Sequence, residues 1–266
     1  IGAAEERPVT SGSGTSALNI ADLSRSYGSL KVLSGVNLEV RGSELVSVVG
    51  PNGAGKTTLM RCISDGYERS SGTVLINGND IGTLPPHALV GFGLGRSFQN
   101  TSLFDSLTVA ECLKLARTRL DTPNTVTRTA DIALPSAAID VVTATGLNSI
   151  LTLEARHLSH GLKRALELAM VLALEPSVLL LDEPTAGLTK TERTMIGGIL
   201  VDLCRRSGLA IVIIEHDLDF VREISSRVVV LHQGAVLLDG TIDEVVNSEL
   251  VRSVYAGKAP VAEAGA

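Results

Sequence analysis

The sequence predicts an α/β fold with a mainly parallel sheet. Three observations lead to this prediction. Strand-sized apolar runs alternate with helix-like stretches along most of the chain. Residues 50–57 form a glycine-rich loop that directly follows one such run and leads into a helix. Aromatic residues make up only 3% of the chain, so the core must be aliphatic, which suits parallel strands buried between helices.

The first elements predict an N-terminal antiparallel β subdomain. Residues 18–23 and 32–40 read as strands, with Tyr27-Gly28 in the turn between them. Residues 45–49 form the strand before the glycine-rich loop, and residues 56–64 form the helix after it. The other expected strands are 72–78, 178–181, 210–214, 227–232 and 235–239, and the other expected helices are 109–119, 138–145, 162–174, 192–206 and 251–257.

Composition along the chain indicates one main domain with flexible ends. Residues 1–16 are rich in small and polar residues and are expected to form a flexible leader. The domain is expected to span residues 17–257, with a helical subdomain inserted at about 101–158, and residues 258–266 to form a flexible tail. The fold class is therefore an α/β core carrying an N-terminal antiparallel β subdomain and an inserted helical subdomain.

Bulk properties exclude several classes of protein. The net charge of −6 argues against a nucleic-acid groove. The three cysteines are widely spaced and odd in number, so reduced thiols are expected. No apolar run approaches the roughly 18 residues that span a bilayer, and we find no signal-peptide pattern. We expect a cytoplasmic protein whose membrane role, if any, depends on a partner.

The glycine-rich loop fits the phosphate-loop pattern G-x-x-x-x-G-K-[ST]. Its glycines let backbone N–H groups converge on phosphate oxygens at a helix N-terminus. Lys56 would reach the outer phosphates, and the hydroxyl of Thr57 would bind Mg²⁺. The predicted nucleotide-binding residues of this loop and its helix are Gly50, Pro51, Asn52, Gly53, Ala54, Gly55, Lys56, Thr57 and Thr58. The core is thus a P-loop NTPase core.

Two acidic residues, Asp182 and Glu183, directly follow the apolar run at residues 178–181. Asp182 would lie at the mouth of the ligand crevice, where a carboxylate can hold Mg²⁺. Glu183 could act as general base toward the attacking water. Together with the phosphate loop, these acids predict a site that binds a nucleotide with Mg²⁺ and hydrolyses it.

A third segment, Leu158-Ser159-His160-Gly161-Leu162, opens a helix. The order of motifs along the chain is the phosphate loop, Gln99, this segment, the two acids and His216. This order resembles that of the ATP-binding cassette (ABC) ATPases from about Leu18 to Tyr255, and the segment looks like their LSGGQ signature. The expected domain at 17–257 is then an ABC ATPase domain.

The resemblance implies further roles. In this family two copies meet head to tail, so Ser159, His160 and Gly161 would contact ATP held by the other copy. Tyr27 corresponds to an aromatic residue stacked on adenine, and His216 to the switch histidine on the γ-phosphate. Gln99 would touch Mg²⁺ and the attacking water and sense the membrane partner. The signature departs from the family pattern at His160 and Leu162.

Three passages resemble the ATPase subunits of importers for branched-chain amino acids, urea and short amides. They are residues 95–109, 183–188 and 215–221. The implied partners are a second ABC ATPase subunit, two integral-membrane permease subunits and, indirectly, an extracytoplasmic solute-binding protein, with no nucleic acid. The implied location is peripheral, on the inner face of the cell membrane. Two alternatives stay open: a soluble ABC ATPase of iron–sulfur cluster assembly, and a nucleic-acid-associated ABC protein.

Overall fold

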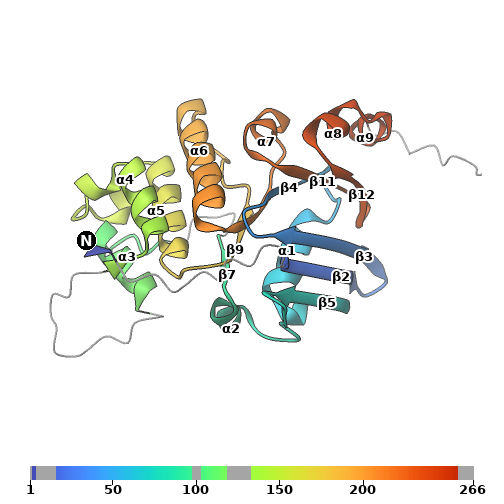
Figure 1. Ribbon diagram of the computed structural model, residues 1–266, viewed down its shortest axis with the longest axis horizontal. Coiled ribbons are helices and arrows are strands. Elements are labelled where there is room, and N and C mark those ends of the chain that lie inside the picture. The colour runs from blue at the N-terminus through green and yellow to red at the C-terminus, as the bar shows by residue number, and fades with distance from the viewer. Residues whose placement is uncertain (1, 4–15, 98–102, 119–132, 257–266) are drawn as a thin grey trace, which may run out of the picture.

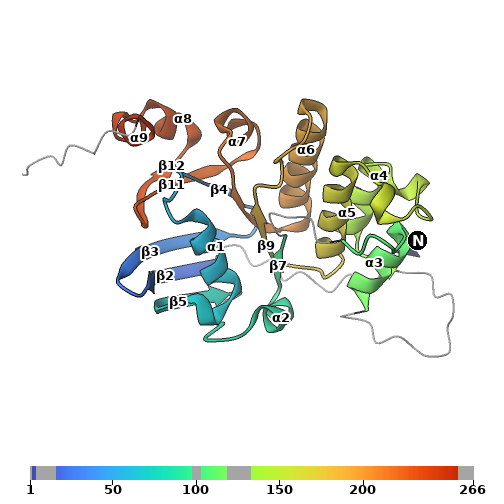
Figure 2. The ribbon, with the colours of Figure 1, turned by 180° about the vertical axis from the view of Figure 1, so that it is seen from behind.

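The structure, a computed structural model, describes residues 2–3, 16–97, 103–118 and 133–256. It places the helical subdomain at one end of the molecule and the antiparallel sheet with the last two helices at the other (Figures 1 and 2). A six-stranded sheet lies between them in the order β12-β11-β4-β10-β9-β7. Its strands are β4 (Leu45–Val49), β7 (Leu94–Arg96), β9 (Val178–Asp182), β10 (Ala210–Ile214), β11 (Arg227–His232) and β12 (Ala235–Gly240).

Every neighbouring pair in this sheet is parallel except β11 and β12. The central strands β4, β9 and β10 are buried on both faces, and alternate residues enter two different cores. In β9, Leu179 and Leu181 face one core while Val178 and Leu180 face the other. Continuous aliphatic runs are the pattern expected of such doubly covered parallel strands.

The first core is covered by helices. α6 (Lys190–Ser207) and α7 (Leu218–Ile224) pack on this face of the sheet, next to the helical subdomain. That subdomain holds α3 (Val109–Arg117) and α4 (Ser136–Ala144), and α5 (His160–Leu172) packs against both. The short strand β8 (Ala133–Leu134) pairs with β1 (Gly2–Ala3), which brings the first residues of the expected leader beside the helical subdomain.

The second core lies between the two sheets. The antiparallel sheet has the order β3-β2-β5-β6, built from β2 (Ser16–Tyr27), β3 (Leu30–Arg41), β5 (Ser71–Ile76) and β6 (Asn79–Asp80). α1 (Lys56–Ser64) contributes Leu59, Met60 and Ile63 to this core. The short α2 (Pro86–Leu89) adds Leu89. The helix that follows the glycine-rich loop is therefore fixed between both sheets.

A third, smaller core joins α7 to the last two helices. α8 (Ile242–Asn247) and α9 (Glu249–Tyr255) contribute Val245 and Val251, which belong to one cluster with Val49 and Val230 of the parallel sheet. The last residue of β4 before the loop is thereby buried as well.

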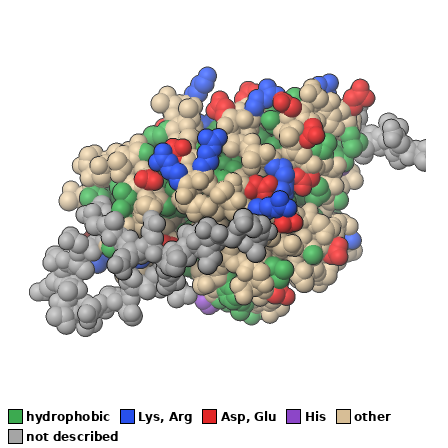
Figure 3. Space-filling model, viewed as in Figure 1, with side chains coloured by type: hydrophobic (Ala, Val, Ile, Leu, Met, Phe, Trp, Pro, Cys, Tyr) green, Lys and Arg blue, Asp and Glu red, His purple; other side chains and the backbone are tan. Residues whose placement is uncertain are grey.

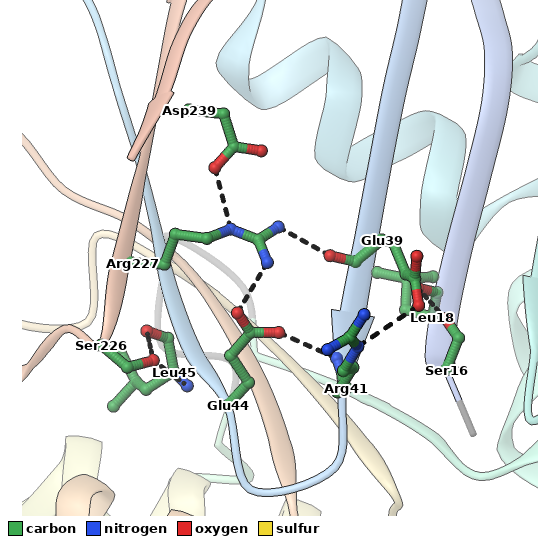
Figure 4. A network of polar contacts seen from close by, with 9 residues as sticks. All are labelled: Ser16, Leu18, Glu39, Arg41, Glu44, Leu45, Ser226, Arg227 and Asp239. Carbon is green, nitrogen blue, oxygen red and sulfur yellow. Dashed lines mark hydrogen bonds and ion pairs between the residues drawn. The ribbon is translucent and has the colours of Figure 1, made fainter. Parts of the chain in front are cut away.

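A polar network joins the two sheets at the amino end of β4 and β11 (Figure 4). Arg227 donates from Nη1 to Glu44 Oε1 at 2.6 Å and from Nη2 to the Glu39 carbonyl at 2.6 Å, and its Nε lies 2.9 Å from Asp239 Oδ1. Ser226 Oγ donates to the Leu45 carbonyl at 2.9 Å. One arginine thus connects β3, β11 and β12, at the end of the sheet opposite to the carboxyl ends of its strands.

The structure confirms the predicted fold class. The strands at 45–49, 210–214 and 227–232 and the helix at 56–64 have the predicted bounds, and the N-terminal strands are longer than predicted. Tyr27 is one correction: it ends β2 and pairs with Leu30, so the turn is Gly28-Ser29. Strand β7 and helices α7 and α8 were not predicted as elements.

Three further findings concern the surface charges, the cysteines and the helices. Acidic and basic side chains are intermixed on the face seen in Figure 3. Cys62, Cys112 and Cys204 are buried free thiols, as predicted. Within the described ranges, every helix is too short or too polar to cross a bilayer.

Candidate functional site

The predicted chemical groups meet where the central parallel strands end. In the sheet register, Ile214 of β10 lies between Val48 of β4 and Asp182 of β9. Because parallel strands end at one edge of a sheet, the segments that follow these three strands are neighbours. They carry the glycine-rich loop, Glu183 and His216. The fold therefore brings together the phosphate loop, the two acids and the predicted switch histidine.

The shape of the loop depends on glycine at two positions. Gly50 has φ +150°, and a Cβ there would lie 2.1 Å from the Leu231 carbonyl oxygen. Gly55 has φ +105°, and its Cβ would lie 2.8 Å from Cδ2 of Leu33. The Gly234 amide also donates to the Ala54 carbonyl at 3.0 Å. Strand β3 and the β11–β12 turn thus press on the loop and hold its backbone.

Lys56 extends along this loop. Its Nζ donates to the Gly50 carbonyl at 2.6 Å and to the Pro51 carbonyl at 3.1 Å. Partial burial lowers the pKa of Lys56, and the nearby carboxylates of Glu183 and Asp182 oppose that shift. The ammonium is therefore bound to the loop and lies near enough to both acids to interact with their charges. Around it, Asn52, Gly53 and Thr57 are exposed, Ala54 is buried and Thr58 is half-buried.

Asp182 is the buried member of the acid pair, only 3% exposed. Burial raises its pKa, and the guanidinium of Arg96 opposes the rise. Arg96 ends β7 and donates to Ser64 Oγ at the end of α1. Three or more acidic, histidine or cysteine ligands do not cluster anywhere in the described part of the chain. A hydroxyl from Thr57 and a carboxylate from Asp182 suit Mg²⁺, which takes few protein ligands and completes its shell with phosphates and water.

Glu183 and His216 face each other across the edge of the sheet. Glu183 Oε1 lies 3.9 Å from His216 Nδ1. Glu183 has φ +49°, a left-handed conformation that costs a non-glycine residue about 1–3 kcal/mol. Its amide donates to the Ile214 carbonyl at 3.0 Å, which holds that conformation against β10. Side chains on these two loops can therefore approach one bound group together.

Tyr27 belongs to none of these loops and lies at the end of β2. Its ring is 42% exposed and lies under the guanidinium of Arg25, 4.2 Å from the ring centroid. Its hydroxyl donates to Glu68 Oε2 at 3.1 Å. An exposed aromatic ring can stack on a planar base, and the adenine contact stays a prediction.

The signature segment lies in the helical part of the molecule. Ser159 caps α5, since its Oγ accepts from the Leu162 amide at 3.3 Å. His160 Nε2 lies 3.1 Å from the Ala186 carbonyl oxygen, and a Cβ on Gly161 would lie 2.2 Å from Glu192 Oε1. Both views separate α5 from α1 (Figures 1 and 2). One chain thus leaves its signature segment away from its own phosphate loop. Gln99 lies outside the described residues.

Sequence reasoning gave no role to three residues beside the site: Arg96, Thr185 and Glu215. Arg96 faces Asp182, and Thr185 bonds to Glu215 behind Glu183. The sequence did carry a signal for Glu215, because this acid comes directly after the apolar run of β10, just as Asp182 comes directly after the apolar residues of β9. The contacts of Arg96 and Thr185 depend on register between strands, which the sequence does not display.

Similarity to known proteins agrees with this geometry. The ABC transporter family profile matches residues 33–186. The high-affinity branched-chain amino acid transport ATP-binding protein BraF of Pseudomonas aeruginosa is 33% identical over 250 residues, 91% of this chain and 98% of that protein. The lipopolysaccharide export system ATP-binding protein LptB of Haemophilus influenzae is 34% identical over 245 residues, 91% and 98% of the two chains.

A solved ATP-binding cassette of an ABC transporter, in its ADP conformation, has the same fold, with a TM-score of 0.79 at 24% identity. It covers 92% of this chain, and this chain covers 100% of it. In this chain the phosphate loop, the acids at the end of β9 and the histidine after β10 follow one another in that order and lie at one edge of the sheet. The chain therefore belongs to the ABC transporter family, as an ATP-binding subunit that hydrolyses ATP.

Proposed function

We propose that this chain drives the import of branched-chain amino acids or related amides or urea through two separate permease subunits. The convergence of Lys56, Asp182, Glu183 and His216 at one sheet edge is the observation that carries the ATPase part. The substrate part is supported by likeness to proteins named for branched-chain amino acid transport. The chain would act from the cytoplasm, bound to the inner face of the membrane, with a solute-binding protein on the outer side. Neither iron–sulfur assembly nor nucleic-acid binding is favoured.

Each site residue receives a role in this proposal. Lys56 and the amides of residues 50–58 would bind the phosphates, and Thr57, Asp182 and Gln99 would hold Mg²⁺, which neutralises phosphate charge when bound. Glu183 would accept a proton from the attacking water. His216 would contact the γ-phosphate from the neighbouring loop. The side chain of Tyr27 would stack on adenine.

The proposal requires a second ATPase subunit, identical or homologous. The signature segment and the phosphate loop of one chain are separated in both views of the fold. Ser159 begins a helix whose N-terminal amides suit an anion. In a head-to-tail pair, Ser159, His160 and Gly161 of one copy would face the ATP held by the other. Leu162 supplies no side-chain hydrogen bond to such an interface.

The ATPase roles are tested by Glu183→Gln. This variant should bind MgATP as the parent does, because the phosphate loop is unchanged. Hydrolysis should slow by about 10²–10⁴-fold, the usual effect of losing a general base. Single-turnover hydrolysis and equilibrium binding of MgATP measure the two quantities separately. Parental turnover in Glu183→Gln would refute the base assignment, and parental ATP affinity in Lys56→Ala would refute the phosphate-loop assignment.

The transport role is tested with the assembled complex. The tagged chain should co-purify with two permease subunits, identified by mass spectrometry, and not with iron–sulfur scaffolds or ribosomes. Right-side-out vesicles loaded with ATP should then accumulate labelled leucine, urea or a short amide, and vesicles carrying Lys56→Ala should not. Similarity to an export ATPase makes the opposite direction the second candidate. Outward movement of solute from the same vesicles would support that candidate and contradict import.

A further inference from the structure

A buried hydrogen-bonded pair lies directly behind Glu183 and His216. Glu215 follows β10 and is 1% exposed, and Thr185 lies two residues after Glu183 and is 3% exposed. The Thr185 hydroxyl donates to Glu215 Oε1 at 2.6 Å, and the Thr185 amide donates to the same oxygen at 3.3 Å. The loop after β9 is therefore bonded to the first residue after β10.

This pair is one of several attachments around Glu183. The Glu183 amide donates to the Ile214 carbonyl at 3.0 Å, and the Glu183 carbonyl accepts from the Ala186 amide at 3.1 Å. Glu183 itself has a left-handed backbone that a free loop would leave. The hydrogen bonds from the Glu183 amide to Ile214 and from Thr185 to Glu215 keep Glu183 in this conformation. The same end of β10 also carries His216.

We propose that Glu215 is a positioning residue for ATP hydrolysis, acting through Thr185 to fix Glu183 relative to His216. The inference rests on the proposed role of Glu183 as general base. The Oε1 of Glu215 holds the loop after β9, while its backbone continues directly into His216. Both loops of the site are thus attached to one buried residue, one through its side chain and one through its backbone.

The surroundings of Glu215 indicate whether its carboxyl group is neutral or charged when it holds the loop after β9. Oε2 is buried and has no hydrogen-bond partner among the described residues. Burial raises the pKa of Glu215, and the bonds from Thr185 together with the charge and the amide of His216 oppose that rise. Burial with one unpartnered oxygen disfavours the charged form, so the neutral acid fits best, with Oε1 accepting from Thr185. Glutamine offers the same acceptor at the same place and is the matched replacement.

Four variants test the link from both sides. Thr185→Val removes the donor and keeps the shape, and Thr185→Ser keeps the hydroxyl. Glu215→Leu removes the acceptor, and Glu215→Gln keeps it. We expect Thr185→Val and Glu215→Leu to lower the single-turnover rate by about 10–100-fold, since a misplacement near 1 Å can have that effect. MgATP affinity should stay within about threefold, and the two conservative variants should hydrolyse within about threefold of the parent.

The decisive measurement combines these changes with Glu183→Gln. If the link acts through Glu183, adding Thr185→Val to Glu183→Gln should lower the residual rate by less than about threefold. A further full loss in that background would show general damage and overturn the proposal. So would a parental rate in Thr185→Val alone, or a slow Glu215→Gln. Parental turnover in Glu183→Gln would instead overturn the base assignment itself, so the two failures are distinguishable.

Discussion

Replacing Gly55 by alanine should disturb the phosphate loop far more than the same change at Gly53, two residues earlier. Both glycines have positive φ, +105° at Gly55 and +79° at Gly53. A Cβ at Gly53 has nothing within 4 Å. A Cβ at Gly55 would lie 2.8 Å from Leu33 Cδ2 and 3.1 Å from the Val32 carbonyl oxygen. Gly53→Ala is therefore a matched control that carries the backbone strain alone.

The loss of stability in Gly55→Ala has two contributions, backbone strain and overpacking, which can be estimated separately. A left-handed backbone costs an alanine about 1–2 kcal/mol relative to glycine, and this applies to both variants. Overpacking against a fixed core costs typically about 1–3 kcal/mol more, and this applies to Gly55 only. Leu33 is fully buried and Val32 is part of β3, so neither can move freely. We expect Gly55→Ala to lose about 2–5 kcal/mol of stability, and Gly53→Ala about 1–2 kcal/mol.

Thermal unfolding without nucleotide measures this difference, because bound ATP would add its own stabilisation. A chain of this size should lose roughly 2–4 °C in Tm for each kcal/mol. MgATP affinity should also fall more in Gly55→Ala, because its loop must shift away from β3. Equal losses of Tm in the two variants would show that β3 does not press on the loop, and would refute the packing argument.

Two further predictions concern residues outside the loop. Arg227→Ala should reduce the unfolding free energy by about 1–3 kcal/mol, because it leaves Glu44 and Asp239 without their shared guanidinium. Urea unfolding should show this loss, and MgATP affinity should be unchanged. A variant as stable as the parent, which is the result expected for the exposed Arg41→Ala, would show that this network does not stabilise the fold. Burial raises the pKa of Glu215, so between the ordinary glutamate pKa and this raised pKa the native state keeps a proton that the unfolded chain loses. The stability contributed by this group therefore falls as pH rises through that range. Glu215→Gln should therefore gain stability relative to the parent as pH rises through that window. Urea midpoints at a series of pH values test this, and a pH-independent difference would contradict it. Repeating the series with His216→Gln in both proteins removes the titrating group that, among the described residues, acts on this carboxyl through its charge.

Much of the fold could be predicted because its central strands are buried on both faces and bounded by recognisable breaks. The strands at 45–49 and 210–214 are uninterrupted or nearly uninterrupted aliphatic runs, and glycines lie at or near their ends. Strand β7 could not be found in this way. It is three residues long, contains Gly95 and Arg96, and exists because it pairs with β9. Its formation depends on a tertiary neighbour, and a local pattern cannot show that.

The site residues likewise divide into those that the sequence could predict and those whose placement it could not. Residues with intrinsic chemistry, such as Lys56, Asp182 and Glu183, stand out because their types and spacing suit phosphate and water. The placement of His160 was less accessible to sequence reasoning. Resemblance assigns it to the ATP of a second copy, whereas within its own chain Nε2 lies 3.1 Å from the Ala186 carbonyl, a contact across 26 positions. The trans role stays a prediction, and the cis contact is an additional finding.

The geometry of the hydrolytic site depends on the sheet more than on its loops. Glu183 and His216 belong to different loops, yet each is attached to the residues at the end of β10, Glu183 through the Ile214 carbonyl and His216 through the chain itself. The register that pairs Ile214 with Asp182 therefore also sets the separation of Glu183 from His216. Aliphatic packing on both faces of β9 and β10 fixes that register. The spacing of Glu183 and His216 is thus a consequence of core packing, and the hydrogen bonds from Thr185 to Glu215 join the two loops that carry them.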